Sequence, residues 1–479
     1  MRSTLAMALL GLGACVTAAR QTPPPDDQPR LDLWVDGSAE GPGLGTRASP
    51  FRALEGALEQ GRSGPATVHL ATGLYAGPFE LPPGVRLEGG KAVVLHAEGA
   101  AVLHAAGAAS LDGLMVQGAG VGLVAGGDVQ LTRVKFSGQR EMAIRLEAGR
   151  LSARDCELAA SLSRTRGLVA GAGTRASLVG CTFVGPFARG LEAAEAEVEV
   201  RGGRFEGPVV GLHQVGGTAR VESTVFSGGR GPAMFSAAGG LVLRGVAVLG
   251  HEYGLQTSRG ARVDVADFES IRAERAALAL EDTTGRLSGV VAVESGPLGA
   301  VQALGSDLTV ERLRIHGPLA SGILVRKGRL VLADATLTDV RGELGRQGDD
   351  TGGDGVVVRE AELRAEGLTV VGASGLGLVA TAGARVRLAA GLFEGCRQGG
   401  IAVDEGAEVE ATSVLVRRTA AAGAVVSGGA VLRADLLTVL QAAGGTVWAD
   451  CGHGARVLLS RTVVEPRGAG APCISPWTR

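Results

Sequence analysis

Three carboxylates lie close together in the sequence, among glycines. Asp349, Asp350 and Asp354 belong to the stretch from Arg346 to Gly355. Carboxylate oxygens are the ligands that Ca²⁺ prefers, so these residues are weak candidates for a metal site. Because their spacing differs from that of a defined calcium loop, we favour a solvated surface loop. We predict no metal site and no cofactor.

A second group combines an imidazole with a carboxylate, which is the chemistry of general acid–base catalysis. His251 and Glu252 stand together, followed by Tyr253, in a turn between two predicted strands. They have no clear partner elsewhere in the sequence. We therefore expect a surface turn at this place, and we assign no catalytic residue.

The composition narrows the classes of function. The chain has 479 residues, 3% aromatic residues and a formal net charge of −2. This net charge produces no field that would attract nucleic acid, and we predict no nucleic-acid partner. Few aromatic residues also leave little flat surface for stacking on bases or sugars.

The elements that would position these residues come from a repeat. Each unit has an apolar residue, another apolar residue five positions later, and then a second half that begins with Gly, as in Leu243, Val248 and Gly254-Leu255. Sixteen units recur about every 23 residues, which lies in the range of solenoid repeats. Their first apolar positions are near Leu111, Leu131, Leu151, Ala176, Val200, Val221, Leu243, Val263, Ser288, Val310, Leu332, Leu363, Leu388, Val409, Leu432 and Leu458.

The side chains within a unit alternate in character, which indicates strands. Val198 and Val200 are apolar, whereas Glu197, Glu199 and Arg201 are charged. Alternation with period two is typical of a strand with one buried face. Short strands without helical segments, in units of this length, predict an all-β fold in which each unit is one coil of a parallel β-helix. A β-propeller is the rival, but its blades need about 40 residues or more.

Six cysteines fit an exported protein. Cys451 and Cys473 are 22 residues apart, about one coil, near the C-terminal end. We predict a disulfide between them, because an exported protein meets an oxidising compartment. Cys156 and Cys181 occupy the same place in successive units, either as a bridge or as two buried thiols.

The N-terminal part carries a resemblance to a known family. Leu33-Trp34-Val35-Asp36-Gly37, Gly45 to Leu54, and Leu81-Pro82-Pro83-Gly84-Val85 resemble the start of many bacterial proteins of the pectin-lyase-like superfamily. The resemblance implies a right-handed parallel β-helix. It implies no single activity, because this superfamily holds lyases, hydrolases, adhesins and structural proteins.

One triplet resembles an enzyme motif of that superfamily. Gly452-His453-Gly454 is similar to a triplet of polygalacturonases. Those enzymes also carry paired Asp residues on neighbouring coils, whereas the nearest acids before His453 are Asp435 and Asp450, each standing alone. We therefore treat the triplet as a chance match in a glycine-rich chain.

A short helix is expected before the coils. Ser49 is a suitable N-cap and Pro50 suits the first turn. One face of the helix would then consist of Phe51, Leu54, Ala57 and Leu58. Such a helix would close the open end of the coil stack, where unpaired strand edges would otherwise invite aggregation.

The first residues have the pattern of a targeting segment. An apolar run from Leu5 to Leu12 is followed by Gly13-Ala14-Cys15, which resembles a bacterial lipoprotein signal. The resemblance implies cleavage before Cys15 and lipid attachment at its thiol. The alternative is ordinary cleavage after Ala19, which would leave a secreted protein.

These observations predict four segments: a signal peptide over 1–14, a lipid-anchored Pro-rich tether over 15–30, an N-terminal cap with the first coils over 31–110, and β-helix repeats over 111–479. We expect a lipid-anchored protein of the cell envelope, with the outer membrane as its site. We expect a structural, adhesive or polymer-binding role, with a polysaccharide or an envelope protein as partner. The alternative is a polysaccharide lyase or glycoside hydrolase that acts on uronate-type polymers.

Overall fold

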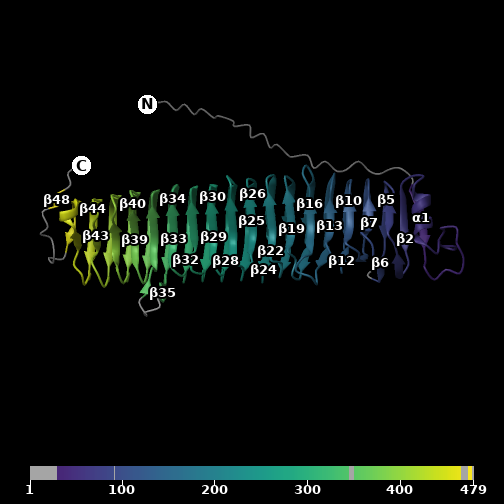
Figure 1. Ribbon diagram of the computed structural model, residues 1–479, viewed down its shortest axis with the longest axis horizontal. Helices are drawn as coiled ribbons and strands as arrows, with labels where there is room; N and C mark the ends of the chain where they lie inside the picture. The colour runs from purple at the N-terminus through teal and green to yellow at the C-terminus, as the bar shows by residue number, and fades with distance from the viewer. Residues whose placement is uncertain (1–29, 91, 345–349, 465–472, 477–479) are drawn as a thin grey trace, which may run out of the picture.

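The computed structural model describes residues 30–90, 92–344, 350–464 and 473–476. They form a straight rod of parallel strands that runs from the N-terminal helix at one end to the last strands at the other (Figure 1). The rod is a parallel β-solenoid of about 18 turns. With neighbouring strands about 4.8 Å apart, it is roughly 85 Å long.

Each coil contributes three strands, one to each of three ladders. In one coil these are β20 (Glu197–Arg201), β21 (Arg204–Glu206) and β22 (Val210–Val215). Within the ladders, strands pair in parallel with the equivalent strand of the next coil, as β20 does with β23 (Thr218–Glu222). We call the outer sides of these ladders the first, second and third face, in that order.

The first ladder begins with separate strands: β1 (Leu31–Val35), β2 (Ala66–Leu70), β5 (Val85–Glu88), β8 (Ala109–Asp112), β11 (Val129–Thr132), β14 (Arg150–Arg154), β17 (Arg175–Val179), β20 and β23. The second ladder begins with β3 (Gly73–Ala76), β6 (Val93–Ala97), β9 (Met115–Gly118), β12 (Lys135–Ser137), β15 (Glu157–Ala159), β18 (Thr182–Val184), β21 and β24 (Val225–Ser227). Both ladders then continue through strands of ten residues: β26 (Gly240–Leu249), β28 (Arg262–Ile271), β30 (Thr284–Val293), β32 (Asp307–His316), β34 (Arg329–Thr338), β38 (Glu362–Val371), β40 (Arg385–Glu394), β42 (Glu408–Arg417) and β44 (Val431–Leu440).

The third ladder runs along the whole rod. Its strands are β4 (Phe79–Leu81), β7 (Ala101–Ala105), β10 (Val121–Ala125), β13 (Met142–Leu146), β16 (Arg166–Ala170), β19 (Arg189–Ala194), β22, β25 (Pro232–Ala237), β27 (Tyr253–Ser258), β29 (Ala276–Glu281), β31 (Val301–Leu304), β33 (Ser321–Arg326), β37 (Asp354–Arg359), β39 (Leu376–Thr381), β41 (Gly399–Val403), β43 (Ala424–Val426) and β45 (Val447–Ala449).

The predicted fold class is confirmed. The sixteen predicted unit starts fall on sixteen successive strands of the first ladder, from Leu111 on β8 to Leu458 on β46 (Arg456–Ser460). Three strands of the same ladder precede them, and β48 (Ile474–Pro476) follows. The expected in–out alternation also holds, because Val198 and Val200 are buried while Glu197 and Arg201 are exposed.

The bend between the first and second strand of a coil depends on one residue with a left-handed backbone. Gly245 (φ 60°) and Gly289 (φ 65°) take this place in β26 and β30, and Asp267 (φ 53°) takes it in β28. Glycine adopts positive φ without the steric cost that a Cβ brings. This recurring bend is one reason why glycine is so frequent in the chain.

The core is a continuous column of apolar side chains, and it contains most of the phenylalanines. Phe183, Phe205 and Phe226 stack on successive coils, with ring centroids 4.4 and 4.6 Å apart. Across the coil, glycines of the third ladder make room for these rings, since a Cβ on Gly211 would lie 2.4 Å from the Phe226 ring. The glycine that begins the second half of each unit therefore has a packing role.

The helix before the coils begins later than predicted. α1 spans Leu54–Gly61 with Ala53 as its N-cap, and no side chain caps it. Phe51 cannot be helical, because its N–H donates to the Trp34 carbonyl and its own carbonyl accepts from Asp36 N–H. The pairing with β1 thus overrides the local Ser-Pro signal, but Leu54, Ala57 and Leu58 are buried as the pattern predicts.

The C-terminal end of the first ladder is held by a covalent link. A disulfide joins Cys451 and Cys473, whose Cα atoms are 5.4 Å apart. Cys451 begins the short 3-10 helix η1 (Cys451–His453), and Cys473 precedes β48, which pairs with β46. The short strand β47 (Val463–Val464) pairs with β44. In the described part of the chain, no helix has the length and apolar character needed to cross a membrane.

Candidate functional site

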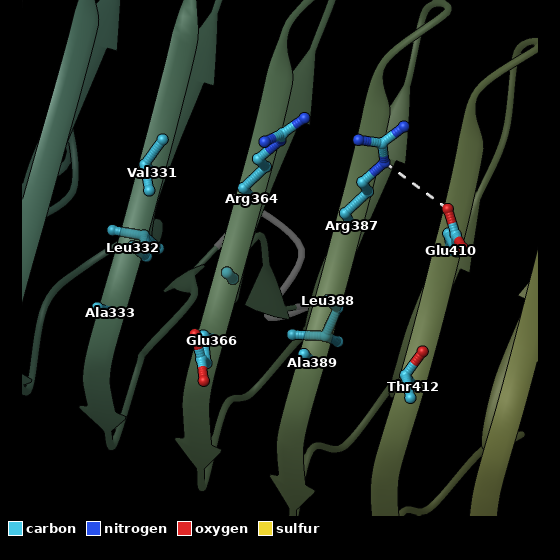
Figure 2. A pocket seen from close by; sticks show the side chains of 11 residues that line it. Val331, Leu332, Ala333, Arg364, Glu366, Arg387, Leu388, Ala389, Glu410 and Thr412 are labelled. Atoms are coloured by element: carbon cyan, nitrogen blue, oxygen red, sulfur yellow. Dashed lines mark ion pairs between the residues drawn. The ribbon is translucent and has the colours of Figure 1, made fainter.

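A groove lies on the first face, toward the C-terminal half of the rod. Alternate residues of β34, β38, β40 and β42 point outward there, because the residues between them fill the core. Long side chains rise beside short ones, and Figure 2 shows Arg364, Arg387 and Glu410 beside Ala333 and Ala389. Together they surround a hollow of about 640 Å³. Its lining is Val331, Leu332, Ala333, Arg364, Ala365, Glu366, Arg387, Leu388, Ala389, Glu410 and Thr412.

A second hollow of about 300 Å³ continues the groove along the same face. The two hollows share Arg364, Arg387 and Glu410. The second one reaches Arg433 on β44. The groove therefore crosses five successive strands, β34 to β44, a length of roughly 19 Å between the outer two.

Ion pairs join the side chains across neighbouring coils. Arg387 Nε lies 3.7 Å from Glu410 Oε2 (Figure 2), and Arg433 NH1 lies 3.4 Å from Glu408 Oε2. Arg364 pairs along its own strand, with its Nε 3.4 Å from Glu362 Oε1. Because the side chains of these pairs are 35–64% exposed, solvent screens them and each contributes little to stability.

Charged side chains of both signs line the groove. On β38, Glu362 and Glu366 flank a single arginine, Arg364. β40 presents Arg385 and Arg387, and β42 presents Glu408 and Glu410. Along the rod, the column of Glu362, Arg385 and Glu408 alternates in sign at steps of about 4.8 Å, whereas the neighbouring column presents two arginines before Glu410.

This arrangement is suited to hydrogen bonding along an extended ligand. Guanidinium groups donate and carboxylates accept, so together they match hydroxyl groups, which do both. Glu362, Glu408 and Glu410 each lie within 4 Å of an arginine.

The weak metal candidates do not join this groove. Asp354 begins β37 on the third ladder, and its Oδ1 accepts a hydrogen bond of 2.7 Å from Leu376 N–H. Burial raises the pKa of this carboxyl, and the hydrogen bond opposes that effect. Asp350 belongs to β36 (Asp350–Thr351), which pairs with β35 (Glu343–Leu344) in a hairpin at the edge of the rod (Figure 1). Asp349 lies outside the described residues, and the residues that are described contain no cluster of three or more metal-binding side chains.

The imidazole of the candidate acid–base pair is in the core, so the expectation of a surface turn was wrong for His251. The ring is fully buried, its Nδ1 lies 3.2 Å from the Gly231 carbonyl oxygen, and its Nε2 has no partner. His251 occupies the inward position at which other coils carry Ala273 or Cys396. Glu252 faces outward and pairs with Arg275 at 3.2 Å, so the two residues do not act together.

The remaining candidates are spread along the chain. His453 is exposed and its Nδ1 lies 2.6 Å from Asp450 Oδ2, far along the rod from Asp354. Cys156, Cys181 and Cys396 are buried free thiols. Cys15 lies outside the described residues.

Sequence reasoning missed the groove, although the sequence contains a signal for it. Arg364, Arg387, Glu410 and Arg433 follow one another at intervals of 23 residues. In a β-helix with coils of that length, residues at this interval form one column on the surface.

Comparisons with known proteins relate the chain to solved structures at low identity. No family model matches it, and no curated protein matches it. One similar structure is the catalytic unit of the thermostable GH87 alpha-1,3-glucanase from Streptomyces thermodiastaticus, with 12% identity and a TM-score of 0.28, covering 93% of this chain and 70% of that one. Another is tailspike protein 3 of bacteriophage CBA120, with 11% identity and a TM-score of 0.29, covering 92% of this chain and 62% of that one. A third is PfbA, a surface adhesin of Streptococcus pneumoniae, with 9% identity and a TM-score of 0.29, covering 88% and 91%.

Proposed function

We propose that this protein is a lipid-anchored rod of the cell envelope, and that the groove from β34 to β44 binds an extended, neutral polysaccharide. The groove is open along the rod and shallow, so it suits a long polymer better than a small molecule, which is usually enclosed in a deeper pocket. Binding of this kind serves adhesion or organisation of the envelope.

The mixture of positive and negative side chains along the groove is the observation that carries this proposal. A polymer with one negative charge per sugar would meet Glu408 and Glu410 on β42 directly after Arg385 and Arg387 on β40. Like charges brought together in this way disfavour binding. A neutral glycan has hydroxyl groups that accept from the arginines and donate to the carboxylates along the groove.

The experiment is a binding panel with the full chain, in which neutral glycans and polyuronates are compared by affinity electrophoresis. We expect neutral glycans to retard the protein, and Arg387→Ala to weaken the retardation at least tenfold, since a lost charged hydrogen bond costs about 1.5–3 kcal/mol. Arg286→Ala is the matched control, because Arg286 has the equivalent outward position on β30, away from the groove. Retardation by polyuronates alone, or an equal loss in both variants, would overturn the proposal.

The alternative is a lyase or hydrolase acting on uronate-type polymers. It has one observation in its favour, because Arg385 and Arg387 on one strand offer two positive groups to a carboxylate. The same panel tests it through the release of unsaturated or reducing ends, with and without Ca²⁺. Turnover that disappears in Glu366→Gln would establish the enzyme in place of the binding protein.

A further inference from the structure

The third face carries an apolar stripe along the C-terminal half of the rod. The outward residue at the centre of each strand is apolar on six successive coils, from β33 to β45. These residues pair in register, coil after coil. The apolar stripe consists of Leu324, Val357, Val379, Ala402, Val425 and Trp448.

The earlier coils provide an internal comparison for the same surface position. There the central outward residues include Glu192, His213, Gln256 and Gln302, so polar and apolar residues are mixed. Trp448 at the far end of the stripe is 52% exposed. A contiguous apolar surface rimmed by polar residues marks an interaction site more often than scattered apolar residues do.

One edge of the apolar stripe has a rim with two halves of opposite charge. Arg326 and Arg359 pair in register at the end of β33 and β37. Asp404 and Asp450 take the equivalent place after β41 and β45, as the bonds from their N–H groups to Ala380 and Val426 show. The half with Arg326 and Arg359 has a net positive charge, because Lys327 pairs with the neighbouring Glu360 and neutralises it. Glu405 adds a further negative charge to the half with Asp404 and Asp450. The rim is thus basic toward the middle of the rod and acidic toward its C-terminal end.

We propose that the apolar stripe is the interface between two copies of this chain, lying side by side in antiparallel directions. A two-fold axis across the stripe, near Thr381, places the basic half of one rim against the acidic half of the other. It also places Leu324, Val357 and Val379 against the far half of the partner's stripe. In the parallel arrangement, the charged rim would face the opposite edge, where Ser321, Leu376 and Gly399 carry no charge and Asp354 is acidic, so the acidic half of the rim would find no basic partner among them.

The arrangement satisfies the requirements of a closed symmetric interface. A two-fold contact uses the same patch on both copies, so the patch must be complementary to itself. An apolar centre with a charged rim is the usual anatomy of such contacts. Straight rods also let the contact run along successive coils, and six coils span roughly 24 Å.

The first test is sedimentation equilibrium of the full chain bearing Cys15→Ser, so that no lipid contributes to association. We expect a dimer that forms in about the micromolar range, as for modest interfaces, and that dissociates more readily in high salt. Val379→Asp should raise the dissociation constant about tenfold or more, because it buries a charge in the centre of the interface. Val169→Asp, at the same outward position on β16 in an earlier coil, should leave association unchanged.

The second test decides the direction of the two chains. One variant carries Arg326→Glu with Arg359→Glu, and the other carries Asp404→Lys with Asp450→Lys. Each variant by itself should stay monomeric, because both copies then present rims of the same charge. An equimolar mixture of the two variants should form a heterodimer at least as tight as the dimer of the unchanged protein. Thermal unfolding of each variant reports whether its fold is intact.

Several outcomes would overturn the proposal. The first is a chain that stays monomeric at tens of micromolar, and the second is a dimer that Val379→Asp leaves unchanged. A heterodimer that fails to form from two well-folded charge variants would exclude the antiparallel arrangement. Binding of another envelope protein to a monomeric rod, lost in Val379→Asp, would assign the stripe to a different partner.

Discussion

At the scale of single residues, His251 places a polar imidazole ring inside a core of apolar side chains. Its Nε2 is a buried polar atom without a hydrogen-bond partner, and such an atom costs free energy in the folded state. Burial lowers the pKa of His251 below its ordinary value of 6.5, against a smaller opposite effect of the Gly231 carbonyl. The native ring is therefore neutral at a pH where the unfolded chain binds a proton.

The stability of the rod should consequently fall as the pH is lowered. Below pH 6.5 the unfolded state gains a proton at this position and the native state does not, so the unfolded state is favoured progressively. We expect the apparent melting temperature to fall between pH 7.5 and 5.5, and to fall less in His251→Leu. His96→Gln is the control, because His96 faces outward on β6; an equal change in both variants would contradict the assignment.

The cysteines should divide into two chemical classes. The neighbouring Cys181 thiol and burial raise the pKa of Cys156, and burial raises the pKa of Cys396 to about 11. Cys156 and Cys396 are thus protonated at neutral pH, and the thiolate is the reactive form. The hydrogen bond with Cys156 lowers the pKa of Cys181, and burial protects this thiol from reagents. We expect no alkylation of Cys156, Cys181 or Cys396 in the native protein, and full alkylation after unfolding without reductant.

Cys451 and Cys473 should behave in the opposite way in the same experiment. They should stay unlabelled after unfolding until a reductant is added, because the disulfide blocks both sulfurs. Peptide mapping by mass spectrometry separates the two classes. A bridged Cys156–Cys181 peptide, or free Cys451 in the unreduced protein, would contradict this division.

At the scale of elements, the packing of rings against glycines holds the three ladders together. A Cβ on Gly211 would lie 2.4 Å from the Phe226 ring and 2.6 Å from the Ala233 carbonyl oxygen. Both neighbours belong to paired strands, so neither moves freely. The coil therefore has no room for even one methyl group at this place.

Gly211→Ala should lower the free energy of unfolding by about 1–3 kcal/mol, the usual cost of overpacking a core. Gly64→Ala should change it by less than about 0.5 kcal/mol, since a Cβ there meets no atom within 4 Å. Denaturant unfolding measures both. If the ring causes the strain, adding Phe226→Leu to Gly211→Ala should recover part of the loss, and purely additive losses would contradict this explanation.

The sequence predicts the ladders better than it predicts the places where ladders meet. The apolar pair of each unit, such as Val221 and Phe226, lies on one coil, and its recurrence located every coil from β8 to β46. The predicted start of the helix was wrong, because Phe51 is held in an extended conformation by hydrogen bonds to residues at β1 that are distant in sequence. The groove and the apolar stripe were missed for a related reason. Outward side chains form a recognisable surface column only when the equivalent positions of several coils are aligned.

At the scale of the whole molecule, the position of the rod depends on the segment before β1. If Cys15 carries lipid, the mature protein should partition with membranes, and Cys15→Ser should release it into the soluble fraction. Two or more acyl chains are needed for stable anchoring. Mass spectrometry of the mature N-terminus is the measurement; an unmodified terminus beginning at Arg20 would instead indicate a secreted protein.

The strands β35 and β36 lie in a long connection between two coils, and this connection does not disturb the pairing of the ladders. β34 pairs with β38 in unbroken register, although Arg329 and its partner Glu362 are 33 residues apart instead of the 23 that separate Glu362 from Arg385. β35 and β36 form a separate two-stranded sheet, and β34 and β38 pair as neighbouring coils do elsewhere. The length of the rod therefore changes in whole coils of about 4.8 Å when coils are gained or lost. Each coil can carry an insertion without a change in this spacing.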